Sequence, residues 1–254
     1  MMTAGGAVIA LLLGTAGVAR SQSAAEHVAL GDKERDARNP TAALQHYEAA
    51  IAADPNEYDA LRNAADECVE LSEFEPNAER RTVLYRSAEQ YARRAVAANP
   101  RDADGHFQLA QALGRNALTM GVRERIKLAS EIRSEALAAL AIDPRHSGAL
   151  HVMGVWNAEI MRVNGFSRTL ARHFLGAAVF DAANWNDAQK YLEGAVAADS
   201  TRIVHRLDLA AVYADRDQRA KAIDQYEWIA RAPVTDYNDP NYKADAKRRL
   251  TALR

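Results

Sequence analysis

The sequence is poor in cysteine, proline and net charge, and each shortage excludes a class of protein. A single cysteine, Cys68, cannot form an internal disulfide and is too few for a cysteine-based zinc site, so we expect a buried, inert thiol. Only 7 prolines and 13 glycines among 254 residues argue against a many-stranded, turn-rich fold. A formal net charge of −2 provides no clustered basic face, so we expect no nucleic acid partner.

The sequence also lacks the motifs that usually carry catalysis. It contains no G-x-S-x-G, H-E-x-x-H or G-x-G-x-x-G pattern and no P-loop. The seven histidines are scattered, and the nearest two, His146 and His151, would point about 140° apart on a helix. We therefore predict a protein that is not an enzyme, with no catalytic residues, no metal site and no cofactor.

The longest uncharged apolar run lies at the amino terminus. Gly5 to Ala19 reads GGAVIALLLGTAGVA, which is shorter than the ~20 residues of a comfortable membrane span. Small residues follow, and Ala19-Arg20-Ser21 resembles a signal-peptidase site before Gln22. We predict a signal peptide over residues 1–21 and a periplasmic or secreted protein. The alternative is an uncleaved segment that anchors the chain to a membrane.

The remaining chain, residues 22–254, is punctuated at recurring intervals. Asp54-Pro55, Asn99-Pro100 and Asp143-Pro144 each follow an alanine-rich stretch, and Asp199-Ser200 follows a similar one. Because the residue before proline disfavours the α-helical region, these pairs mark helix ends. Alanine is the strongest helix former, so the punctuation predicts a series of helical units.

Small and large residues alternate within each unit in the way that lets two antiparallel helices approach closely. The pattern resembles the tetratricopeptide repeat (TPR), which pairs helices into stacked hairpins. The matching positions are Leu30-Gly31 with Ala43, Tyr47 and Ala50; Ala64-Ala65 with Ala88, Ala92 and Ala95; Leu109-Ala110 with Ile132, Ala136 and Ala139; Met153-Gly154 with Ala188, Leu192 and Ala195; and Leu209-Ala210 and Tyr213 with Ala222 and Tyr226.

These matches predict an all-α, TPR-like α-solenoid of about five helical hairpins over residues 22–254. Asn241 to Leu253 reads as a further helix with a Lys/Arg-rich outer face, which suits a cap on the open end of the array. We also expect an extra helix in the insertion from about Asn164 to Ala183. We expect Asn184 to be the N-cap of the helix after it.

The stretch from about Arg123 to Leu250 resembles the TPR-like domain of the regulator of microtubule dynamics family. The resemblance is carried by RERIKLASEIRSEALAALAIDP, HVMGVWNAE from His151 to Glu159, Trp185-Asn186-Asp187-Ala188, and the tail from Asp239 to Leu250. It implies a helical scaffold, and some members of the family resemble lipid-binding or lipid-transferring domains. The organelle roles of its eukaryotic members are not carried over to this chain.

The first helix of each TPR hairpin lines the concave side of the array, which defines the candidate binding residues. His151, Val155 and Glu159 recur every four residues and share one helix face. Equivalent positions in the other units give Arg62, Asp66, Phe107, Gln111, Arg115 and Leu207. Arg62 and Arg115 could hold a carboxylate or phosphate. The alternative is that these side chains are packing residues or ordinary solvated charges.

Two functions remain open at this point. The first is a scaffold that binds a protein or peptide partner in its concave groove. The alternative is a carrier of a lipid or other apolar ligand, suggested by Phe166, Leu170, Phe174 and Phe180 in the insertion. A polar groove would favour a peptide, and a closed apolar tunnel would favour a small apolar ligand.

Overall fold

The computed structural model describes residues 22–117, 119–163 and 181–254, and its described residues form helices and connecting loops without a β-strand. The extra helix that the sequence predicts in the insertion falls mainly on residues 164–180, outside the described part. The helices are α1 (Ala24–Asp36), α2 (Pro40–Ala53), α3 (Tyr58–Glu73), α4 (Ala78–Ala98), α5 (Ala103–Ala117), α6 (Val122–Ile142), α7 (Ser147–Arg162), α9 (Trp185–Ala198), α10 (Ile203–Asp215), α11 (Arg219–Arg231) and α12 (Asp239–Leu253).

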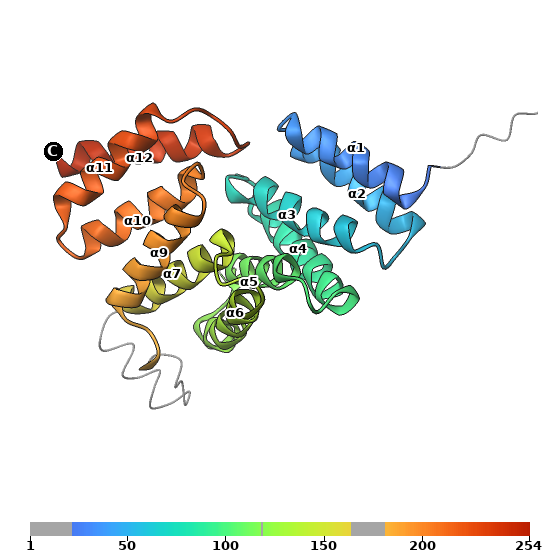
Figure 1. Ribbon diagram of the computed structural model, residues 1–254, viewed down its shortest axis with the longest axis horizontal. Coiled ribbons are helices and arrows are strands. Elements are labelled where there is room, and N and C mark those ends of the chain that lie inside the picture. The colour runs from blue at the N-terminus through green and yellow to red at the C-terminus, as the bar shows by residue number, and fades with distance from the viewer. Residues whose placement is uncertain (1–21, 118, 164–180) are drawn as a thin grey trace, which may run out of the picture.

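The helices pair into hairpins that follow one another in a curved array (Figure 1). The pairs are α1–α2, α3–α4, α5–α6, α7–α9 and α10–α11, and α12 packs on α11 and α10. This arrangement confirms the predicted TPR-type solenoid. The terminal helix begins at Asp239, two residues before the predicted start, because Pro240 is accepted in the first turn of a helix.

Small residues at the predicted seam positions bring the two helices of each hairpin together. The alanines of the α4, α6 and α9 seams have no exposed surface. A methyl group on Gly154 of α7 would lie 2.4 Å from Cγ of Leu192 on α9, so only glycine fits this contact. Gly31 of α1 is pressed against the ring of Tyr47 on α2 in the same way.

Side-chain caps fix where several helices begin. Ser23 and Glu26 form a reciprocal capping box at the start of α1. Asn184 accepts a hydrogen bond of 2.8 Å from the Asp187 amide at the start of α9, as the sequence predicts. Pro55, Pro100 and Pro144 lie in the loops that follow α2, α4 and α6.

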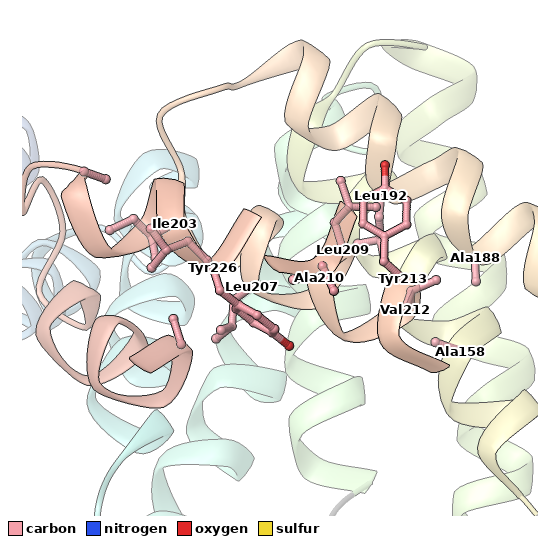
Figure 2. Packing of buried hydrophobic residues seen from close by; sticks show 14 residues of the cluster. Ala158, Ala188, Leu192, Ile203, Leu207, Leu209, Ala210, Val212, Tyr213 and Tyr226 are labelled. Carbon is pink, nitrogen blue, oxygen red and sulfur yellow. The ribbon is translucent and has the colours of Figure 1, made fainter. Parts of the chain in front are cut away.

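Buried apolar side chains form a series of clusters along the array. In its last part, residues of α10 pack with Leu192 of α9 and Tyr226 of α11 (Figure 2). Trp156 of α7 is buried in the middle part, and its indole nitrogen donates to the carbonyl of Ala129 at 2.8 Å. Cys68 is also buried there, as expected.

The loop between α11 and α12 reaches across to the first half of the chain (Figure 1). Asn238 donates through Nδ2 to the main-chain carbonyl of Glu70 at 2.9 Å and to its carboxylate at 2.6 Å. Arg38, in the turn between α1 and α2, donates to the carbonyl of Val234 at 3.0 Å. The array therefore curves until its two ends are joined across the inner side.

Within the described ranges, no helix has both the length and the apolar character that a membrane span requires.

Candidate binding site

A cavity of about 220 Å³ opens on the inner side of the array, where α3, α5, α7 and α10 face one another. The loop before α12 and the first turn of α12 close it with Asn238 and Tyr242. We call it the central cavity. Its charged lining consists of Asp66, Glu70, Glu73, Asp199, Arg115 and Arg202, and its other lining includes Phe107, Gln108, Gln111, His151 and His205.

A second cavity, of about 440 Å³, adjoins the first and lies between the α1–α3 region and the loop before α12. We call it the side cavity. Three residues, Asp66, Glu70 and Arg202, line both cavities. The side cavity adds Arg35, Asp36, Arg38, Glu67 and Asp236 to the charged surface. The inner side of the array is therefore a polar channel.

Most cations of the channel are already held by carboxylates. Arg115 is paired with Glu73, and Arg202 is paired with Asp236 and lies 3.7 Å from Glu70. Nε2 of His151 lies 2.8 Å from Oδ2 of Asp208. Burial acts to raise the pKa of Asp208, but the His151 hydrogen bond and the nearby guanidinium groups outweigh it and lower that pKa.

Two carboxyl groups of α3 are poorly stabilised in their charged form. Burial raises the pKa of Glu67 to about 8, with a further contribution from the charge of Asp66, although Arg35 lies 3.2 Å away and acts in the opposite direction. Burial and the charges of Asp236 and Asp66 also raise the pKa of Glu70. A cation in the channel would stabilise both charged forms.

Several buried side-chain atoms of residues that line the central cavity have no hydrogen-bond partner among the described residues. They include Oδ1 of Asn238, Oε1 of Gln108, Oε1 of Gln111 and Nδ1 of His205. His205 is neutral, because burial together with the charges of His151 and Arg202 lowers its pKa to about 3. Buried polar atoms are rarely left without a partner, so this cavity has capacity for a polar ligand.

The structure brings five of the nine sequence-predicted binding residues to the central cavity. They are Asp66, Phe107, Gln111, Arg115 and His151, and they come from α3, α5 and α7. Whether they contact a partner stays a prediction.

The other four predicted residues lie away from both cavities. Arg62 is paired with Asp59 at 3.3 Å and with Asp104 at 3.2 Å. Glu159 is exposed and hydrogen-bonded to Arg162. Leu207 is buried in the core, and Val155 packs against the same core cluster.

Several residues of the central cavity are not predicted from the sequence, and only some of them lie at positions that helical spacing indicates. Glu70 and Glu73 follow Asp66 by four and seven positions, so helical spacing could have placed them on the same face of α3. Other missed residues come from the last part of the chain. Arg202 lies immediately before α10, Asn238 lies in the loop before α12, and Tyr242 lies in the first turn of α12. Their arrival at the cavity depends on the curvature of the whole array, which no local pattern encodes.

No group of three or more His, Cys, Asp or Glu side chains within the described ranges is arranged to hold a metal ion.

The fold is shared with solved TPR proteins. A thermophilic TPR protein from Thermus thermophilus superposes with a TM-score of 0.61 at 21% sequence identity, covering 89% of this chain and 99% of that one. The structure from the functional characterisation of Pseudomonas aeruginosa pilF superposes with a TM-score of 0.51 at 16% identity, covering 91% of both chains. At these identities the likeness shows the fold alone.

By sequence, the chain matches no curated protein. Residues 23–254, however, match the family described as regulator of microtubule dynamics protein 1-3, well beyond the stretch from about Arg123 that carries the resemblance in the sequence. This match covers the whole helical array, and the stacked hairpins are those of a TPR protein. The chain therefore belongs to the regulator of microtubule dynamics protein 1-3 family.

Proposed function

We propose that this protein is an exported, non-enzymatic scaffold that binds a segment of a protein partner in its inner channel. The TPR-type fold supports a role in protein interaction, because stacked hairpins form an extended concave surface. The observation that carries the proposal is the pair of adjoining cavities on that surface. Their polar lining and unpartnered acceptor atoms suit the main chain and polar side chains of an extended peptide.

The alternative, a carrier of a lipid or other apolar ligand, has less support from the described residues. Apolar ligands are held in mostly apolar pockets. Here carboxylates and guanidinium groups face both cavities, and their desolvation by an acyl chain would be costly. The apolar residues on which the lipid reading rests, Phe166, Leu170, Phe174 and Phe180, lie outside the described ranges.

Site-specific photo-cross-linking tests the binding proposal. Replacing Tyr242, which lines the central cavity, by p-azidophenylalanine keeps the ring and puts a reactive group where a partner would lie. The matched control places the same group at Val83 on α4, which is 61% exposed and lines neither cavity. In cells we expect a discrete protein adduct from the Tyr242 position and none from the Val83 position.

Two results would count against this proposal. The first is that both positions give the same adducts or that neither gives one. The second is that native mass spectrometry of the purified protein finds a stoichiometric lipid that is lost on replacing cavity residues, which would favour the carrier.

The proposal of export rests on the sequence of residues 1–21. Cell fractionation followed by N-terminal sequencing of the mature protein tests it. We expect a mature chain that begins at Gln22 outside the cytoplasm. A membrane-bound chain with an intact amino terminus would instead support the anchor.

A further inference from the structure

The charges that line the central cavity do not balance. Four carboxylates, Asp66, Glu70, Glu73 and Asp199, face two guanidinium groups, Arg115 and Arg202. Both guanidinium groups are already engaged, by Glu73 and by Asp236. Carboxyl groups are therefore in excess over guanidinium groups, mainly on α3, and a cation bound there would favour the charged form of Glu70, whose pKa is raised by burial.

Asp66 is the least satisfied of these carboxylates. It lines both cavities and is only partly exposed, and among the described residues it makes no hydrogen bond or ion pair. Glu70 lies one helical turn further along α3, so the two carboxylates share a face. A positive group between them would gain two charge-assisted contacts.

Asn238 supplies an independent observation, because its side chain is 1% exposed and only half used. Its Nδ2 donates to both the carbonyl and the carboxylate of Glu70, which fixes which end of the amide is the acceptor. Its Oδ1 therefore remains a buried acceptor without a partner, in a residue that lines the central cavity. Gln108, which lines the same cavity and is 5% exposed, has a second buried oxygen without a partner. Both side-chain oxygens therefore lack a hydrogen-bond donor.

We propose that the central cavity is a receptor site for a cationic side chain, the ammonium group of lysine or the guanidinium group of arginine, of the partner segment. Asp66 and Glu70 neutralise its charge, and Asn238 accepts one of its hydrogen bonds. This inference rests on the proposed function and specifies the chemistry of the partner.

The size of the cavity agrees with a single side chain. About 220 Å³ is below the range of roughly 300–1,000 Å³ that holds drug-sized ligands, whereas a single long aliphatic side chain needs less space. The adjoining side cavity offers room for the neighbouring residues of an extended segment. A free alkylamine carries the same kind of cationic group as a lysine side chain, and the experiment below distinguishes the two ligands.

Selection of random peptides on the immobilised full chain tests the site. Asp66→Asn removes the unpaired carboxylate and keeps its shape, and Asp59→Asn, on the same helix but outside both cavities, is the matched control. We expect the wild-type chain and the control to select peptides with lysine or arginine at one fixed position. Asp66→Asn should weaken binding of such a peptide about tenfold or more, as expected for a charged hydrogen-bonded contact. Circular dichroism checks that all three chains fold.

Calorimetric titration with the small amines cadaverine and agmatine tests the cation site independently of peptide binding. Failure to select any peptide contradicts the proposed function, but Asp66-dependent binding of these amines would still support a cation site. Selected peptides without a fixed basic residue overturn the cation site and leave peptide binding intact. Basic peptides that bind Asp66→Asn as tightly as wild type also overturn it. Absence of both peptide and amine binding overturns both proposals.

Discussion

At the scale of single residues, two glycines on first helices of their hairpins have opposite roles. Gly154 is in contact with Leu192, where an added methyl group would lie 2.4 Å from Cγ and 3.1 Å from the backbone nitrogen. Gly114 lies within α5 with nothing within 4 Å of the same position. The first glycine is required by packing, and the second is not.

Substitution by alanine should therefore change stability in opposite directions. Gly154→Ala should lower the free energy of unfolding by about 1–3 kcal/mol, because the α7–α9 contact must open. Gly114→Ala should raise it by about 0.5–1 kcal/mol, since alanine is the better helix former. Urea unfolding of both variants checks this, and equal effects would contradict the close contact between α7 and α9.

The buried carboxyl of Glu67 predicts a pH dependence of stability. Its pKa rises from the ordinary 4.5 to about 8 in the folded chain, so the folded state holds this proton more tightly than the unfolded state. Stability from this group is therefore lost as the pH rises from about 4.5 to about 8. Glu67→Gln should be stabilising at about pH 9, by roughly 1–3 kcal/mol, and nearly neutral at about pH 5.

Thermal unfolding at several pH values measures the difference between the variant and wild type. Glu79→Gln, which removes an exposed carboxyl on α4, serves as the matched control for the substitution itself. An unchanged difference between Glu67→Gln and wild type across this pH range would contradict the burial of a carboxyl that resists ionisation.

At the scale of elements, the start of α9 depends on one side chain. Asn184 caps the helix through its bond to the Asp187 amide, at the point where the chain returns from the insertion. Asn184→Ala should cost about 1 kcal/mol of stability, whereas Asn184→Ser should retain most of it because serine also caps. Chemical denaturation compares the two variants. Equal losses would show that the cap does not define this helix start.

The helices could largely be predicted from the sequence, because their determinants are local. Proline-marked ends and the Asn184 cap act within a few residues, and each alanine seam joins the two helices of a single hairpin. Because these determinants are local, the sequence predicts only part of the central cavity. Asp66 and Gln111 follow from helix spacing, but Asn238 and Arg202 reach the cavity through the curvature of the array. Leu207 satisfies the same spacing and is nevertheless buried in the core.

At the scale of the whole molecule, contacts between distant segments join the two ends of the array. Asn238 and Glu70, separated by 168 residues, form the most buried of these contacts. Asn238→Ala should lower stability by about 1–3 kcal/mol and widen the distribution of distances between spin labels on α1 and α12. Asn241→Ala, at an exposed position three residues later, is the control. Identical distance distributions in both variants would contradict the closure.

Partners are proposed to bind on the inner side of this array. Hydrogen–deuterium exchange of the full chain, with and without the partner segment recovered by cross-linking, tests this binding most directly. We predict slower exchange in α3, α5 and the loop that contains Asn238, and unchanged exchange in α4, α6 and α9. Protection confined to α4, α6 and α9 would contradict binding on the inner side.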